Sequence, residues 1–133
     1  LMGDPDRLHA YSFTPDVAAG LVVLGEDERA LGEVWHLPVA DPWTTRQVVD
    51  RVYGLAGTRP KLFAAGRTSL RLYGLVTPEM REYLHTLYQF TQDWVVSDAK
   101  FRAAFGDRST PLPEALAATL DWYREQAAVP AGA

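Results

Sequence analysis

The residues of this chain that could transfer protons or bind metal are spread thinly along the sequence. Its histidines, His9, His36 and His85, contain no i, i+4 pair of the kind that forms a helical zinc site. A lysine four residues after a tyrosine can lower the tyrosine pKa for proton transfer, but no tyrosine of this chain is followed by lysine at that spacing. The chain has no cysteine, which excludes thiolate metal sites and cysteine nucleophiles.

The glycine-rich signatures of nucleotide binding are also missing from the sequence. It contains neither G-x-G-x-x-G nor G-x-x-x-x-G-K-[ST], and therefore no dinucleotide-binding turn and no phosphate-binding loop. The G-x-S-x-G turn that exposes a serine nucleophile is absent too. The sequence predicts no catalytic residues and no metal site.

A few polar and aromatic residues remain as candidates for contact with a small ligand: His9, Tyr11, Tyr88 and Gln89. The first two lie in a loop or strand that leads into the first predicted helix. The other two fall outside the helical stripe formed by Tyr83, Leu87 and Phe90, so they are freer to face a ligand. Packing or solvent exposure is the more common role for such residues, and His36, inside an apolar segment, is expected to be a hydrogen-bonded core histidine.

Composition restricts the class of protein further. The chain has 133 residues, 47% hydrophobic and 23% charged, with a net charge of −4 and no cluster of lysine or arginine. Nucleic-acid and anionic-membrane surfaces need a concentrated basic field, so neither partner is expected. No apolar run approaches the roughly 18 residues of a membrane span, and a cytoplasmic location is expected.

Two helices are predicted in the first half of the chain. Thr14 is expected to cap the first, with Pro15 in its first turn and Asp16 near the positive end of its dipole, and it should run to about residue 27. Thr44 and Gln47 form a capping box for the second, whose buried stripe is Val48, Val49, Val52 and Leu55 and whose C-terminal cap is Gly57.

The second half is predicted to be mainly helical. Helices are expected over 69–76, 78–90 and 98–105, the last closed by Gly106. A final helix should be capped by Thr110 and should bury Leu116, Leu120 and Tyr123. Three short strands are expected at 34–38, 61–63 and 94–96, and residues 129–133 are expected to be a disordered tail. The predicted fold class is therefore an α-rich α/β protein, and three isolated strands make a poor sheet unless they join a larger one.

Three segments together resemble the C-terminal half of extended short-chain dehydrogenases/reductases, the NAD-dependent epimerase/dehydratase family. HAYSFTPDVAAGLVVL is similar to the family's aromatic strand followed by Val-Asp-Asp-Val-Ala and a helix. LGEVWHLPVADPWTTRQVVDRVYGLAG is similar to its Tyr-Asn strand, capping residue and helix. VVSDAKFRAAFGDRSTPLPEALAATLDWYRE is similar to its Asp-x-x-Lys, Gly, Pro and amphipathic-helix ending.

The resemblance covers about residues 3–126 and implies a division of labour. In this family the N-terminal Rossmann part holds NAD or NADP and the Tyr/Lys pair, while the C-terminal part binds the substrate. The resemblance therefore implies that residues 1–128 form a substrate-binding domain, inactive without the cofactor part and binding no cofactor alone, with His9, Tyr11, Tyr88 and Gln89 as its substrate contacts.

One departure from the family bears on the substrate. An arginine that holds the diphosphate of nucleotide sugars is replaced here by His9, and the aspartate after it by Ala10. An imidazole is a poor substitute for a bidentate guanidinium, so a nucleotide-sugar substrate is not expected. The alternative hypothesis is a free-standing helical domain for binding or assembly, whose exposed strand edges pair with a second copy or a partner chain. Under either hypothesis a tendency to form a homodimer is expected.

Overall fold

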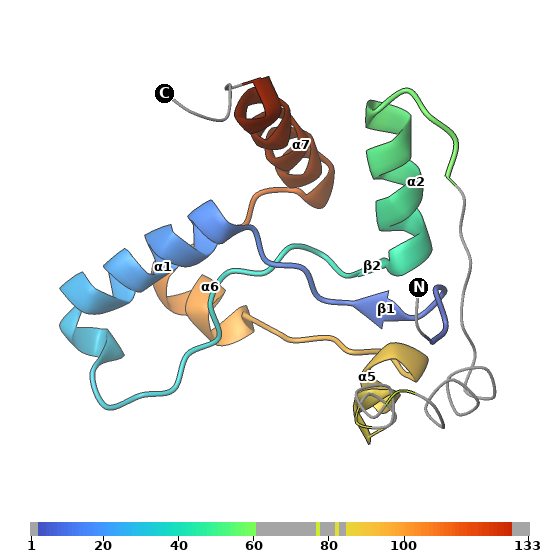
Figure 1. Cartoon of the computed structure of the whole chain (residues 1–133). Coiled ribbons are helices and arrows are strands. Elements are labelled where there is room, and N and C mark those ends of the chain that lie inside the picture. Colours follow the sequence, from blue (N-terminus) through green and yellow to red (C-terminus); the bar gives the residue numbers. More distant parts are fainter. Residues whose placement is uncertain (1–2, 61–76, 78–81, 83–84, 129–133) are drawn as a thin grey trace. The chain divides into compact units, whose positions relative to one another are not determined.

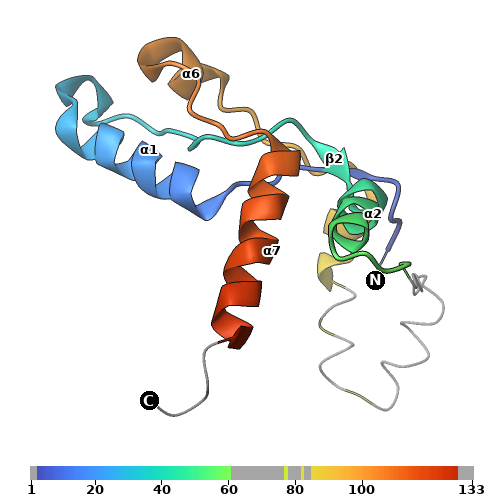
Figure 2. The same cartoon turned by 90° about the horizontal axis from the view of Figure 1, so that it is seen from above.

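The computed structural model describes residues 3–60, 77, 82 and 85–128 of the chain (Figures 1 and 2). This part of the chain is helix-rich and has a short two-stranded antiparallel sheet. In chain order its elements are β1 (Leu8–His9), α1 (Thr14–Glu26), the 3-10 helix η1 (Glu28–Ala30), β2 (Trp43–Thr44), α2 (Thr45–Leu55), α5 (Tyr88–Thr91), α6 (Ala99–Phe105) and α7 (Leu112–Ala128).

The chain divides into two units, and each unit combines stretches that are distant in the sequence. Unit 1 contains Leu1–His9 and Trp43–Val95, and unit 2 contains Ala10–Pro42 and Val96–Ala133. Unit 1 thus includes β1, β2, α2 and α5, whereas unit 2 includes α1, η1, α6 and α7.

Unit 1 is organised around β1. This strand pairs antiparallel with β2, so that His9 lies opposite Trp43. His9 also forms a parallel bridge with Trp94, whose N–H donates to the Leu8 carbonyl at 2.8 Å. The Leu8 N–H in turn donates to the Asp93 carboxylate at 3.0 Å. Backbone and side-chain hydrogen bonds therefore hold the 93–94 segment against β1, 85 positions away in the sequence.

The turn that precedes β1 packs against the backbone of α5. The Asp4 N–H donates to the Phe90 carbonyl at 2.8 Å. Gly3 has φ +80°, and a Cβ added there would overlap the main chain and Cβ of Phe90. Position 3 therefore requires glycine both for its left-handed conformation and for this close approach.

Helix α2 begins and ends as the sequence predicts. The Thr44 hydroxyl accepts from the Gln47 N–H at 3.2 Å, and the Gln47 side chain accepts from the Thr44 N–H at 2.8 Å, which completes the capping box. At the other end Gly57 has φ +68°, and the Thr58 N–H donates to the Tyr53 carbonyl at 3.0 Å. This is the Schellman pattern of a glycine-terminated helix. The predicted stripe is half-buried at every position: Val48, Val49, Val52 and Leu55.

Unit 2 has a small core between α1, α6 and the segment that follows η1. Phe101 of α6 and Pro38 are its largest fully buried side chains. Gly20 of α1 faces Pro38 so closely that a Cβ would lie 2.8 Å from the proline Cδ. Buried Gly20, with half-buried Val17, therefore contributes the inner face of α1, while Leu21 is exposed.

The two helix caps predicted at Thr14 and Thr110 are wrong, because both threonines have other positions. Helix α1 already includes Thr14, and its N-cap is Phe13, which provides no side-chain cap. Helix α7 begins at Leu112, two residues after Thr110. The carbonyl of Pro111, not that of Thr110, accepts from the first helical amides, those of Glu114 and Ala115.

Thr110 instead connects the start of α7 to α1. Its hydroxyl donates to one oxygen of the Asp16 carboxylate at 2.8 Å, and its N–H donates to the other at 2.6 Å. These bonds place the start of α7 beside the N-terminal end of α1 (Figure 1).

The strand predicted at 34–38 is also wrong, because this segment forms neither strand nor helix. Pro38 has no N–H to contribute to a ladder, and Val34 is 82% exposed. His36 is exposed rather than a core residue, and its Nδ1 lies 2.8 Å from the Ser97 carbonyl, to which it donates. The segment is therefore held by individual hydrogen bonds instead of a sheet.

The other predicted elements have mixed outcomes. The helix over 98–105 is confirmed as α6, which ends at Gly106 with φ +82°. The predicted strand 94–96 is reduced to the single bridge at Trp94. The strand at 61–63, the helix at 69–76 and the tail 129–133 lie outside the described residues, as do 78–81 and 83–84 of the helix predicted at 78–90. The described residues of that helix are 82 and 85–90, and all of them except Leu87 are helical. No helix within the described ranges is long and apolar enough to cross a bilayer.

Candidate functional site

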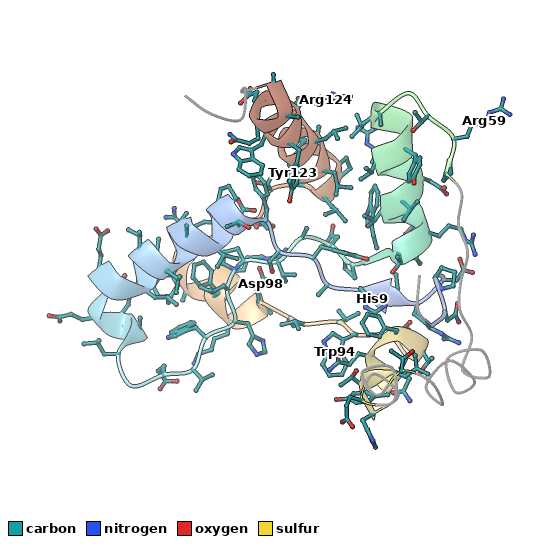
Figure 3. All side chains as sticks on the ribbon, in the orientation of Figure 1. His9, Arg59, Trp94, Asp98, Tyr123 and Arg124 are labelled. Atoms are coloured by element: carbon teal, nitrogen blue, oxygen red, sulfur yellow. The ribbon has the colours of Figure 1, made fainter. Side chains whose placement is uncertain are left out.

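An aromatic cluster surrounds β1 and α5 in unit 1. The His9 ring lies 6.4 Å from the ring of Phe90, measured between centroids. Tyr88 and Trp94 meet edge to face at 5.7 Å, and they are 47% and 46% exposed. Figure 3 shows that His9 and Trp94 belong to neighbouring segments, as their backbone bridge requires. We call His9, Tyr88, Phe90 and Trp94 the aromatic cluster.

The cluster includes two of the residues that the sequence predicts as substrate contacts. His9 and Tyr88 are joined through Trp94, which bridges the first and packs against the second. Gln89 lies in α5 between Tyr88 and Phe90 and is half-buried. Tyr11 belongs to unit 2, where its carbonyl accepts from the Ala40 N–H at 3.1 Å. The structure therefore assembles His9, Tyr88 and Gln89 in one unit and Tyr11 in the other.

Phe90 and Trp94 are the members of the cluster that the sequence did not single out as ligand contacts. Tryptophan is more often a core or interface residue than part of a binding surface, and no local pattern distinguishes Trp94 from the other tryptophans. Trp94 is 46% exposed, and its place in the cluster depends on the bridge to His9, 85 positions away.

In the described part of unit 1, ion pairs lie in the turn before β1 and on α2. Arg46 binds the Asp6 carboxylate through two nitrogens, at 2.7 and 2.9 Å, and this hydrogen bond lowers the pKa of Asp6. Arg7 pairs with Asp4 at 3.0 Å. Asp93, next to the cluster, accepts from the Leu8 N–H. The aromatic cluster is thus a surface suited to stacking and shape recognition rather than to proton transfer between paired acids and bases.

Asp98 is the buried charged residue of unit 2. It lies at the N-cap position of α6, where one carboxylate oxygen accepts from the Val39 N–H at 3.2 Å. The other oxygen accepts from Arg102 at 2.9 Å, and this hydrogen bond raises the arginine pKa. Both oxygens are therefore used to join the 38–40 segment to α6, which indicates a structural role rather than a catalytic one.

A stack of cations and aromatic rings lies beside Asp98 in unit 2. Lys100 lies 4.2 Å from the ring centre of Trp35 and binds Glu33 at 2.7 Å, which lowers the pKa of that glutamate. The rings of Trp35 and Phe105 pack with their centroids 5.0 Å apart. The Arg29 guanidinium lies over the Phe105 ring, 5.0 Å from its centroid. Cation–π contacts of this kind fix the position of the residues they join. The stack anchors the η1 region to α6.

A half-open groove of about 640 Å³ lies between the start of α1 and the middle of α7. Trp122 and Tyr123 form its aromatic wall, with ring centres 4.9 Å apart and planes at 78°. They are 54% and 62% exposed, so the expectation that Tyr123 is buried is wrong. The full lining is Ser12, Phe13, Thr14, Pro15, Ala118, Thr119, Trp122 and Tyr123. We call this the α1–α7 groove.

The groove is a second candidate for ligand contact, and the sequence did not predict it. Sequence periodicity assigned Tyr123 to a buried face because it assumes that every turn of the helix is covered. The Trp122–Tyr123 pair was the available signal, since adjacent aromatics cannot both lie at the centre of one helical stripe.

No group of three or more His, Cys, Asp or Glu suited to holding a metal ion occurs in the described part of the chain. Comparison with protein-family models, with curated proteins and with solved structures finds no significant match.

Proposed function

We propose that this chain is the substrate-binding part of an NAD(P)-dependent oxidoreductase of the epimerase/dehydratase type. In this proposal a Rossmann-type part supplies NAD or NADP and the proton-transfer residues, and this chain supplies substrate contacts. The aromatic cluster carries the proposal, because it combines partly exposed ring surfaces with an imidazole, groups suited to binding a ring compound. His9, Tyr88 and Gln89 are the proposed contacts in unit 1, and Tyr11 is the proposed contact in unit 2.

Contacts between the segments that carry the family resemblance give further support. Asp16, in the first segment, accepts two hydrogen bonds from Thr110 in the last. Asp98, also in the last segment, accepts from Val39 in the middle one. Asp16 and Asp98, which belong to the motifs that resemble the family, therefore also join distant segments of unit 2.

The cluster residues His9, Tyr88, Phe90 and Trp94 include no guanidinium or ammonium group, and this bears on the substrate class. A ring of a hydroxy or keto compound can stack on Trp94 or Tyr88, and the Gln89 amide can donate to and accept from its oxygens. A diphosphate would need a guanidinium or a similar cation in place of His9. The proposed substrate is therefore a small, weakly charged hydroxy or keto compound.

Binding experiments with the chain test both parts of this proposal. Titration with NADH and NADPH, followed by fluorescence, should show no saturable binding, and saturation at micromolar cofactor would contradict the division of labour. A panel of cyclic hydroxy and keto compounds should shift the NMR signals of His9, Tyr88 and Trp94. Trp94→Ala should abolish these shifts, whereas Trp122→Ala, in the other unit, should leave them unchanged. A panel that shifts none of these signals would count against substrate binding at the cluster.

The second candidate is an assembly domain that associates with a copy of itself. Its support is the number of large apolar side chains that are more than half exposed: Leu21, Val22, Leu31 and Val34 in addition to the groove aromatics. Exposed apolar surface commonly marks a contact with another protein. Sedimentation equilibrium over a hundredfold concentration range distinguishes the two, because a chain that stays monomeric throughout cannot use these residues for self-assembly.

A further inference from the structure

The α1–α7 groove has the dimensions and lining of a small-molecule site. Its volume of about 640 Å³ lies within the range of roughly 300–1,000 Å³ found for ligand pockets. Eight residues line it, well below the roughly 20–30 residues a side of a stable protein–protein interface. A second copy of the chain would therefore need much more surface than the groove provides, whereas a ligand of one or two rings fits it.

The aromatic wall of the groove favours a flat ligand. Because the Trp122 and Tyr123 rings are nearly perpendicular, they form a corner in which a ring can stack on one face and contact the edge of the other. Both side chains remain more than half exposed, so a ligand could cover them without displacing other side chains.

Charge in and around the groove favours a neutral ligand. None of the described residues that line it is charged. An anion would be attracted to the positive end of α1, but the Asp16 carboxylate lies in that first turn and opposes it. On α7 the neighbouring charges are Asp121 and Arg124, which pair with each other at 2.9 Å.

The α1 end of the groove provides hydrogen-bond donors. Ser12 and Thr14 contribute hydroxyl groups. Phe13, at the N-cap, cannot accept from the first-turn amides with its side chain. Pro15 has no N–H, so the first turn offers the amides of Thr14 and Asp16, which have no acceptor within the helix. A carbonyl oxygen directed at this end would therefore meet several donors.

We propose that the α1–α7 groove binds an uncharged, flat, two-ring compound that carries a carbonyl oxygen. Its ring system stacks in the Trp122–Tyr123 corner, and its oxygen accepts from the Ser12–Thr14 end. This site lies within unit 2 and does not depend on the substrate role proposed for the aromatic cluster of unit 1.

Coumarin is the test probe, because it has two fused rings, a carbonyl oxygen and no charge. Titrated into the ¹⁵N-labelled full chain, it should produce saturable NMR shifts at Ser12, Thr14, Thr119 and the Trp122 indole. Coumarin-3-carboxylate, which adds one negative charge, should bind at least tenfold more weakly. Indole, which has two fused rings but no acceptor oxygen, should also bind more weakly, and equal binding would overturn the assignment of the carbonyl.

Two substitutions locate the site. Trp122→Ala and Tyr123→Ala should each weaken coumarin binding at least tenfold, and because both side chains are exposed, the remaining NMR spectrum should be retained. Val95→Ala, at an exposed apolar residue of unit 1 that does not line the groove, is the control and should leave the affinity unchanged. The proposal is overturned if coumarin does not saturate, if its carboxylate binds equally well, or if Val95→Ala weakens binding as much as the two groove substitutions. It is also overturned if the groove signals shift with protein concentration alone, since a second copy would then occupy the groove.

Discussion

Single carboxylates carry much of the long-range organisation of unit 2. Asp16 was predicted to act locally, through the dipole of its own helix, and it also accepts two hydrogen bonds from Thr110, 94 positions later. Asp98 was predicted only as the start of a helix, and it holds the Val39 amide 59 positions earlier. Residue type and spacing indicate that these carboxylates lie at the starts of helices. A local sequence pattern cannot predict their distant hydrogen-bond donors, Thr110 and the Val39 N–H.

Removal of the Asp98 carboxylate should destabilise the chain strongly. Asp98→Ala leaves the buried Val39 N–H without an acceptor and Arg102 without its nearer partner. We expect a loss of about 1–3 kcal/mol in the free energy of unfolding, measured by urea denaturation. Asp107, the more distant and exposed partner of Arg102 at 3.5 Å, provides the control, and Asp107→Ala should change stability by only about 0.5 kcal/mol. Equal effects of both substitutions would contradict the structural role of Asp98.

Asp27 should titrate at unusually low pH. The Arg29 side chain donates to both of its carboxylate oxygens, at distances down to 2.6 Å, which lowers the pKa of Asp27 from 3.8 to about 2. A carboxyl whose pKa falls on folding stabilises the folded state above its unfolded pKa. This contribution is therefore complete above about pH 5 and is lost as the pH falls from about 4 towards 2.

The Asp27 titration can be followed by carboxyl ¹³C NMR. Arg29→Gln should move the midpoint back towards 3.8, because it removes the donor that causes the shift. A wild-type midpoint already at 3.8 would show that the pair does not persist in solution.

At the scale of elements, the sequence predicted helices well and strands poorly. α2 and α6 carry their boundaries in their own residues, through the capping box at Thr44 and the glycines at 57 and 106. β1 and β2 contain two residues each, too few for any alternation to be visible. The strand predicted at 34–38 had a suitable composition but found no partner, because strand formation depends on a neighbour that the segment does not encode.

The same limit applies to the candidate sites. His9, Tyr88 and Gln89 could be selected by residue type, whereas their assembly depends on the bridge between His9 and Trp94. The α1–α7 groove depends on the Asp16–Thr110 hydrogen bonds, which bring the starts of two helices together. Residues could thus be nominated from the sequence, but their grouping required the structure.

The capping box of α2 gives a prediction at this scale. Thr44→Ala removes the hydroxyl that accepts from the Gln47 N–H, and loss of an N-cap costs about 1 kcal/mol. Thr44→Ser keeps the hydroxyl and should retain most of the stability. Thermal unfolding of the two variants measures the difference, and no difference between serine and alanine would mean that the cap does not contribute.

For the whole molecule, the interleaved composition of the two units affects how the chain opens. Cooperative opening of a region depends on the contacts within that region. Because Asp16 and Thr110 both belong to unit 2, loss of their hydrogen bonds should affect the opening of unit 2. Thr110→Val removes the hydroxyl donor from this pair. Amide hydrogen exchange should then become faster at the starts of α1 and α7 and stay unchanged in α2 of unit 1. Faster exchange in α2 by the same factor would show that the two units open together.

The separation between Asp16 and Thr110 also sets an order of events during synthesis. Helix α1 leaves the ribosome long before α6 and α7, because the residues that complete unit 2 follow only after position 95. At about 5–20 residues per second, the 94 positions from Asp16 to Thr110 correspond to a delay of roughly 5–20 s. During this interval Gly20 can already pack against Pro38, but Asp16 lacks its Thr110 donors, so the newly made α1 segment is the part expected to need a chaperone.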